Sequence, residues 1–243
     1  MDKLEIFHAE NPEAAVAWAG EALNQLLGDY KKLPVLLMLS GGSALSMLDY
    51  VGKTVLSENL TVSMLDDRFS QDAAVNNFLQ MQKTDFYVDA QEADVSFLGT
   101  VARPGEKIEE LNARWEKNLK AWQMENPEGK ILATVGMGAD GHTAGIFPYP
   151  EDPEKFDRLF NRDSLTVAYN AIGKHKYSER VTTTLKFFEQ IDEAVILVTG
   201  VEKKQKLEEV LAKKNQPNEL PALAWYQIKK ATLVTELKNF SKS

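Results

Sequence analysis

The chain has 243 residues, of which 44% are hydrophobic, so it is long and apolar enough for one large α/β domain with a continuous core. It has no cysteine and three histidines, which excludes disulfides, thiolate catalysis and cysteine-ligated zinc and disfavours a histidine-rich metal site. The formal net charge of -8 argues against nucleic acid and anionic membranes as partners, because both are polyanions that attract lysine and arginine.

The N-terminal residues 1–10 are mixed and charged, and no apolar run approaches the roughly 18–20 residues needed to cross a bilayer. We therefore expect a cytoplasmic protein without a signal peptide or a membrane span. We also expect a monomer or a small homo-oligomer, with residues 1–243 forming a single domain.

Apolar runs of strand length alternate along the chain with longer amphipathic stretches. Runs rich in valine, leucine and isoleucine predict strands at residues 33–39, 61–65, 95–98, 131–135, 165–169, 194–199 and 231–235. Apolar residues at helical spacing predict helices at residues 12–27, 44–56, 75–86, 104–124 and 203–212. This alternation predicts a three-layer α/β fold, in which helices cover both faces of a mostly parallel central sheet.

Two further stretches bear on packing and organisation. Trp115, Leu119 and Trp122 have core spacing within their helix and are interpreted as packing residues. Residues 148–162 are rich in proline and charge, and we predict a long loop there. In a parallel sheet, ligands bind beyond the carboxyl ends of the strands, so the loops that follow predicted strands are the candidate sites of chemistry.

The first such loop is Ser40-Gly41-Gly42-Ser43, between a predicted strand and a predicted helix. Its backbone N–H groups and hydroxyls at a helix N-terminus form a ready site for an anion. The loop lacks the Gly-Lys-Ser/Thr ending of a nucleotide P-loop and the spacing of a dinucleotide fingerprint, so a small-molecule phosphate fits it better than ATP or NAD. The alternative is a tight turn in which Ser43 caps the helix.

The second loop contains Asp66, Asp67 and Arg68 and is followed by Asn76 and Asn77. Two carboxylates and an arginine at a strand end suit the binding of a polar ring. Arg68 can make forked hydrogen bonds to an anion or to a developing oxyanion. A solvated, salt-bridged turn is the alternative interpretation.

The third loop places His142 among glycines and two residues after Asp140, directly behind an apolar run. Glycines let the backbone adopt conformations that other residues avoid and let a substrate come close. Imidazole is the side chain whose unperturbed pKa lies nearest neutral pH. The arrangement suits a catalytic base, with Asp140 orienting the imidazole or capping the following helix, and the alternative is a plain turn with a structural histidine.

Five motifs occur in the order seen in one enzyme family. They are Ser40-Gly41-Gly42-Ser43, Asp66-Asp67-Arg68 with its downstream asparagine, Gly136-Met137-Gly138-Ala139-Asp140-Gly141-His142-Thr143-Ala144, Glu179-Arg180-Val181-Thr182 and Gly200-Val201-Glu202-Lys203. Through them most of the chain resembles the 6-phosphogluconolactonases, which share a fold with the glucosamine-6-phosphate deaminases. The resemblance implies a fold of the glucosamine-6-phosphate deaminase/ribose-5-phosphate isomerase-like type.

The resemblance also implies an activity and a set of roles. The activity is hydrolysis of the phosphorylated sugar lactone 6-phospho-D-glucono-1,5-lactone to 6-phosphogluconate, a step of the pentose phosphate pathway, with no metal and no organic cofactor. His142 would deprotonate the attacking water, and Asp140 would orient it. Arg68 would bind the carbonyl oxygen or sugar hydroxyls, and Asp66 would contact the substrate. The groups implied to hold the phosphate are Ser40, Gly41, Gly42, Ser43, Arg180 and Lys203.

Two other functions stay open. Glucosamine-6-phosphate deaminases resemble the chain at Asp140-Gly141-His142 but have a glutamate shortly afterwards, where Phe147-Pro148 stands here. They need that carboxylate for ring opening and proton transfer, and Phe147 cannot move a proton. A non-catalytic sugar-phosphate-binding protein is the second alternative, and such a sensor would need no catalytic base.

The chain departs from the family pattern at several places. Asp67 stands where the family usually has glutamate, and Gly145 replaces a usual serine. Residues 173–178 lack the prolines common there. We expect the side chains of Lys174, His175 and Lys176 to be exposed to solvent, and contact of His175 or Lys176 with the substrate is the alternative. The Trp-x-x-Asp-x-x-Ala ending typical of the family is absent.

Overall fold

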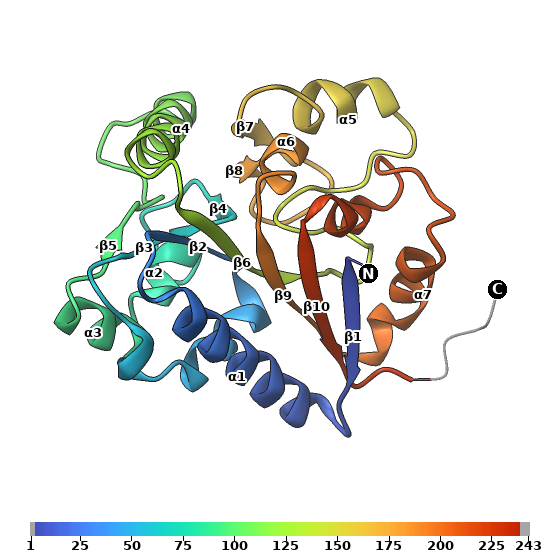
Figure 1. The fold of residues 1–243 in the computed structure, drawn as a ribbon. Helices are drawn as coiled ribbons and strands as arrows, with labels where there is room; N and C mark the ends of the chain where they lie inside the picture. Colours follow the sequence, from blue (N-terminus) through green and yellow to red (C-terminus); the bar gives the residue numbers. More distant parts are fainter. Residues whose placement is uncertain (1–2, 239–243) are drawn as a thin grey trace.

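The structure is a computed structural model that describes residues 3–238 (Figure 1). Its centre is a seven-stranded sheet in the order β1-β10-β9-β6-β2-β3-β5, and every pair of neighbours is parallel. In chain order the strands are β1 (Leu4–His8), β2 (Val35–Leu39), β3 (Leu60–Met64), β5 (Ser96–Phe97), β6 (Lys130–Gly136), β9 (Glu193–Val198) and β10 (Lys230–Thr235). The predicted parallel sheet is confirmed.

The central strands are apolar because both of their faces are covered. All five residues of β2 are buried, as are all five of β3. Successive side chains of a strand point to opposite faces, so Leu36 joins one hydrophobic core and Leu37 joins the other. Edge strand β1 was not predicted, because four of its five residues are exposed and its sequence has no buried run to mark it.

Helices form a layer on each face of the sheet. One layer contains α1 (Pro12–Tyr30), η1 (Gly42–Tyr50), η2 (Lys53–Val55), α2 (Asn77–Met81) and α3 (Asp85–Glu92). The other contains α4 (Ile108–Glu125), α5 (Pro153–Phe160), α6 (Leu185–Phe188), α7 (Lys204–Ala212) and η4 (Pro221–Gln227). Within residues 3–238, no helix has the length and apolar character needed to span a bilayer.

The helices differ from the sequence prediction in several places, and two of the helices, α6 and η4, were not predicted. Residues 44–56, predicted as one helix, form the 3-10 helices η1 and η2. Residues 75–86 form two short helices, because Thr84 starts α3 by accepting a hydrogen bond from the Tyr87 amide. The predicted loop 148–162 contains α5, where Asp152 caps the helix and a proline occupies the first turn.

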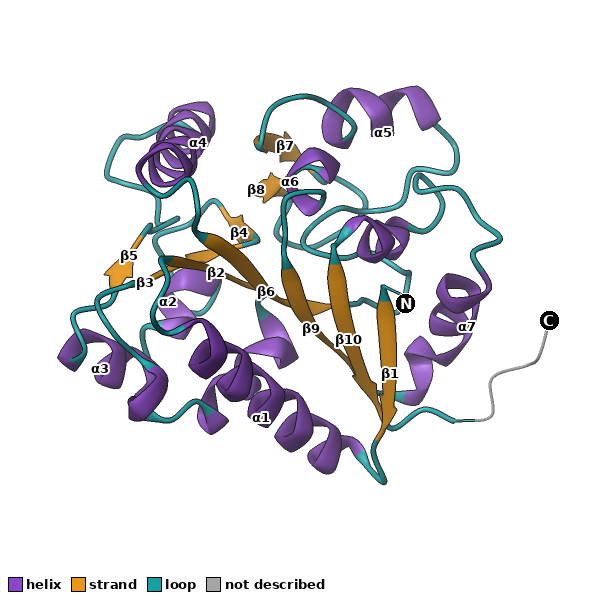
Figure 2. Cartoon of the chain, viewed as in Figure 1, coloured by secondary structure: helices purple, strands orange, loops and turns teal. Residues whose placement is uncertain are grey.

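A second, three-stranded sheet lies beside the first and supplies part of the site (Figure 2). It is antiparallel, with the order β4-β8-β7, formed by β4 (Asp66–Arg68), β7 (Thr166–Asn170) and β8 (Glu179–Thr183). The predicted strand at residues 165–169 therefore exists, but it does not join the parallel sheet. Because β4 begins two residues after β3 ends, the chain passes directly from one sheet to the other.

Helix α4 packs against this small sheet as well as against the core. Trp115 and Leu119 have no exposed surface, and Trp122 is also buried, which confirms the predicted packing stripe. The Trp115 indole N–H donates to the hydroxyl of Ser63 at 3.0 Å, and the Trp122 indole donates to Thr61 at 3.2 Å. These bonds pair the polar atoms of two large core side chains with hydroxyls on β3.

Candidate active site

One cavity collects the loops that were singled out in the sequence. It lies beyond the carboxyl ends of β2 and β6, next to β4 and β8. Nine of the ten predicted site residues line it, and Asp140 does not. Its lining residues are Ser40, Gly41, Gly42, Ser43, Asp66, Arg68, Asn77, Gly136, Met137, Gly138, His142, Ala144, Gly145, His175, Arg180 and Lys203. The expected convergence of strand-end loops is therefore observed.

The loop after β2 requires its glycines. A Cβ atom on Gly41 would lie 2.2 Å from Oδ1 of Asn77, so the side chain of Asn77 occupies the space that any other residue would need. Gly42 has φ +64°, a left-handed conformation that favours glycine, and it begins η1. The hydroxyl oxygen of Ser40 is buried and has no hydrogen-bond partner among the described residues.

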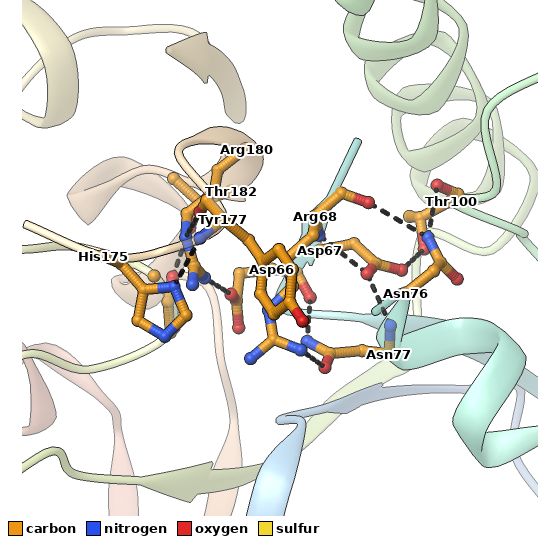
Figure 3. Close-up of polar contacts among 12 residues, drawn as sticks. Asp66, Asp67, Arg68, Asn76, Asn77, Thr100, His175, Tyr177, Arg180 and Thr182 are labelled. Carbon is orange, nitrogen blue, oxygen red and sulfur yellow. Dashed lines mark hydrogen bonds and ion pairs between the residues drawn. The ribbon is translucent and has the colours of Figure 1, made fainter. Parts of the chain in front are cut away.

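Asp66 and Arg180 form a buried ion pair between β4 and β8. Nη1 of Arg180 lies 3.0 Å from Oδ2 of Asp66, and Nε donates to the carbonyl of Tyr177 at 3.2 Å (Figure 3). No hydrogen bond within residues 3–238 uses Nη2 of Arg180 or Oδ1 of Asp66. Each partner therefore keeps one polar atom for a ligand.

Gly145 lies against this ion pair. A Cβ atom at Gly145, which has φ +67°, would lie 2.8 Å from Oδ2 of Asp66. The hydroxyls of Tyr169 and Thr182 donate to the carbonyls of Gly145 and Ala144, so β7 and β8 hold this turn in place. Residue 145 is thus a glycine, where the family usually has serine, at a point where the backbone lies close to Asp66.

Arg68 is held by the segment that leads into α2. Its Nη1 donates to the carbonyl of Val75 at 2.9 Å and to Oδ1 of Asn77 at 2.8 Å. Figure 3 shows the bond to Asn77. Nδ2 of Asn77 in turn donates to the carbonyl of Asp66 at 3.0 Å. Nε of Arg68 is buried without a partner among the described residues. The guanidinium is therefore fixed through Nη1, and no hydrogen bond within residues 3–238 uses its Nη2.

Asp67 lies behind the cavity and organises it. Its carboxylate accepts hydrogen bonds from the amides of Arg68, Asn77 and Phe78 and from the hydroxyl of Thr100. Burial raises the pKa of Asp67 to about 7, although these hydrogen bonds favour the charged form. Asp67 does not line the cavity. The aspartate that replaces the family's usual glutamate therefore acts on the residues that support the site.

His142 follows β6 in a turn that Asp140 closes. Oδ1 of Asp140 accepts a hydrogen bond from the backbone N–H of His142 at 3.1 Å and lies 2.6 Å from Nδ1 of its ring. A carboxylate at Nδ1 places the ring proton there, so Nε2 is free to accept a proton. Burial opposes ionisation of Asp140, but the hydrogen bonds and charge of His142 prevail and lower the pKa of that carboxyl.

Lys203 approaches the cavity from η3 (Val201–Lys203), directly after β9. Gly200 has φ +101°, and its N–H donates to Oε1 of Glu236 at 2.8 Å, which fixes the turn. Burial lowers the pKa of Lys203 despite the nearby charges of Glu202 and Glu236. Within the described residues its ammonium forms no ion pair, so it is a partly buried cation that an anion would stabilise.

Comparison with known proteins identifies the family. Residues 9–234 match the family of glucosamine-6-phosphate isomerases/6-phosphogluconolactonases. The chain belongs to this family. It is 26% identical over 193 residues to a 6-phosphogluconolactonase of Haemophilus influenzae, covering 73% of each chain. It is 32% identical over 101 residues to one from Helicobacter pylori, covering 42% of this chain and 41% of that relative.

Solved structures of family members share the fold. A 6-phosphogluconolactonase from Plasmodium vivax superposes with a TM-score of 0.77 at 12% identity, covering 99% of this chain and 93% of the other. One from Trypanosoma brucei gives a TM-score of 0.76 at 17% identity and covers 97% of both chains. The predicted family and its fold type are therefore confirmed.

Three residues of this family member lie where the sequence analysis did not place them. Lys174 and His175, expected in solvent, are half-buried, and His175 lines the cavity, whereas Lys176 is exposed as predicted. Phe147 is buried against the site, with its ring 4.5 Å from that of His142 and 5.1 Å from the guanidinium carbon of Arg180. The loop that contains His175 leads into β8, the strand of Arg180. This closeness in sequence to a predicted site residue was the signal that could have placed His175 at the cavity.

Proposed function

We propose that the protein hydrolyses 6-phospho-D-glucono-1,5-lactone to 6-phosphogluconate, with His142 as the general base. One observation is central. Asp140 occupies Nδ1 of His142 and leaves Nε2 free in a cavity that three cationic side chains also line. The relatives named 6-phosphogluconolactonase support the choice of substrate.

The reaction needs a base, a water molecule and stabilisation of an oxyanion. Nε2 of His142 takes a proton from water as the water oxygen attacks the lactone carbonyl. The negative charge that develops on the carbonyl oxygen is stabilised by Arg68, whose Nη2 forms no hydrogen bond within residues 3–238. Asp140 stabilises the imidazolium. The imidazolium then returns its proton to the ring oxygen as the carbon–oxygen bond breaks and the acid is released.

The phosphate is assigned to the opposite part of the cavity. The unpaired hydroxyl of Ser40 and the amides of the glycine loop supply neutral donors. Nη2 of Arg180 and the ammonium of Lys203 supply positive charge. A phosphate dianion would compensate the partly buried charge of Lys203, which has no ion-pair partner among the described residues.

Asp66 has two roles in this proposal. Its Oδ2 holds Arg180 in place, and its Oδ1, which has no partner in the described chain, can accept a hydrogen bond from a sugar hydroxyl. The cycle requires no metal and no organic cofactor. We further propose that residues 1–243 act as one domain in the cytoplasm, as a monomer or a small homo-oligomer, with no nucleic-acid or membrane partner.

The deaminase activity of the same family is disfavoured by Phe147. Deaminases have a glutamate at this point, and here a buried phenyl ring contacts the rings of His142 and His175. No carboxylate is therefore available there to open the sugar ring. A purely sugar-phosphate-binding role is disfavoured by the Asp140–His142 pair, because binding alone requires no oriented base.

The deciding assay follows acid release from freshly generated 6-phosphogluconolactone against the spontaneous rate. We expect strong acceleration by the purified protein and no ammonia from glucosamine 6-phosphate. Efficient ammonia release would assign the deaminase activity. Binding of 6-phosphogluconate without acceleration of either reaction would leave a sugar-phosphate sensor.

A further inference from the structure

A second imidazole, that of His175, faces the proposed active site. His175 lies in the loop between β7 and β8, and its side chain lines the same cavity as His142. Its ring is 6.1 Å from the ring of Phe147, which separates it from His142. In Figure 3 it lies on the side of Arg180, away from Asp67 and Thr100. The reaction described above has no role for this group.

One hydrogen bond fixes the tautomer of His175. The backbone N–H of Tyr177 donates to Nδ1 at 3.1 Å, so Nδ1 is unprotonated and the ring proton is on Nε2. No hydrogen bond within residues 3–238 uses Nε2. The neutral ring therefore offers an N–H donor that the described protein leaves unused.

The surroundings keep this donor uncharged. Burial lowers the pKa of His175, and the positive charges of Arg180 and Arg68 lower it further. The charge of His142 acts in the same direction when that ring is protonated. Protonation at Nδ1 would also break the bond from Tyr177. His175 is thus suited to hydrogen bonding rather than to proton transfer or to the neutralisation of an anion.

We propose that His175 is a specificity-determining residue, which donates a hydrogen bond from Nε2 to a hydroxyl oxygen of the sugar acid. A neutral donor matches a neutral acceptor, whereas the phosphate already has Arg180, Lys203 and the glycine loop. This assignment rests on the proposed lactonase function, which defines the substrate. It concerns a loop in which this chain lacks the prolines common in the family.

The neighbouring Lys176 provides a matched control. Its side chain is exposed, does not line the cavity, and has its ammonium 5.2 Å from the centre of the Tyr177 ring. If KM depended on the charge or the mobility of this loop in general, Lys176→Ala would change KM as well. If KM depends on a hydrogen bond from the imidazole of His175, Lys176→Ala leaves KM unchanged.

The test compares His175→Asn with His175→Gln. Asparagine keeps an acceptor near the position of Nδ1 and loses the distal donor, whereas glutamine places an amide N–H near the position of Nε2. Both variants lose the ring, so the difference between them isolates the donor. For His175→Asn we expect KM for the lactone and the inhibition constant of 6-phosphogluconate to rise about five-fold, as for loss of one neutral hydrogen bond.

The other readouts make the result decisive. We expect His175→Gln to stay within about two-fold of wild type, and kcat and the inhibition constant of inorganic phosphate to be unchanged in both variants. Thermal melting verifies that each variant is folded. Equal KM values for wild type, asparagine and glutamine variants would overturn the proposal, as would a parallel loss of phosphate affinity. If the wild type itself failed to accelerate lactone hydrolysis, the proposed function would fail instead.

Discussion

At the scale of single residues, the Asp140–His142 hydrogen bond determines which nitrogen can act as a base. The contact of 2.6 Å occupies Nδ1, and no hydrogen bond within residues 3–238 uses Nε2 of His142, whose side chain lines the cavity. Gly138 makes the turn possible, because a Cβ atom there would lie 2.1 Å from Cε1 of His142. The sequence motif predicted the pair, and its glycine spacing has a steric explanation.

The first prediction concerns His142 itself. Replacing it with alanine removes the base that acts on water in the transition state but none of the groups assigned to the phosphate. We expect kcat for lactone hydrolysis to fall by about 10² or more, with little change in the affinity for 6-phosphogluconate. Full activity of His142→Ala, corrected for the spontaneous rate, would exclude the proposed base.

The second prediction separates binding from stability at the Asp66–Arg180 pair. Arg180→Ala should raise KM and also lower the unfolding free energy by about 3–5 kcal/mol, because it leaves Asp66 buried without its partner. Adding Asp66→Asn should recover much of the stability, measured by urea unfolding, while KM stays high. A low KM in the double variant would remove Arg180 from the phosphate site.

At the scale of elements, α2 and β4 are joined through Asp67. The carboxylate binds the amides of Asn77 and Phe78 at the start of α2 and that of Arg68 on β4. This linkage places Asn77 against both Gly41 and Arg68. No local sequence pattern predicts this linkage, because the hydrogen-bond partners of Asp67 lie up to 33 residues away in the sequence.

The third prediction follows from the pKa of Asp67, which burial raises to about 7. A raised carboxyl pKa means that the native state binds the proton more tightly than the unfolded state. The contribution of Asp67 to stability is therefore greatest below the unfolded pKa and is lost as pH rises through about 7. The melting-temperature difference between wild type and Asp67→Asn should thus shrink from pH 4 to pH 7.

A difference that instead grows with pH would show that the four hydrogen bonds outweigh burial and keep Asp67 charged.

The elements also show where local patterns are sufficient. The buried runs of β2, β3, β6, β9 and β10 predicted strands correctly, because strands covered on both faces are continuously apolar. Residues 166–170 have the same character but pair antiparallel with β8. Pattern alone does not identify a strand's partner. β4 is three polar residues long, and only its long-range pairing with residues 180–182 makes it a strand.

At the scale of the whole molecule, the cavity joins parts of two sheets. The glycine loop follows the parallel strand β2, Lys203 follows β9, and Arg180 belongs to the antiparallel β8. The parallel-sheet rule predicted the convergence of the loops after β2, β3 and β6. It could not predict the contribution of the small sheet, which required the register that places Arg68 opposite Arg180.

The fourth prediction concerns ligand binding in the cavity that the two sheets form together. A ligand that binds the native state alone stabilises it by about 2.7 kcal/mol at one hundred times its Kd, so 6-phosphogluconate should raise the melting temperature by several degrees. Lys203→Ala should lose most of the shift at the same ligand concentration, because the proposed phosphate site loses a cation. It should not itself destabilise the protein, since the ammonium has no ion-pair partner in the described chain. The control is Lys176→Ala, at an exposed residue outside the cavity, which should show the same rise in melting temperature as wild type. An undiminished rise in Lys203→Ala would place the phosphate elsewhere.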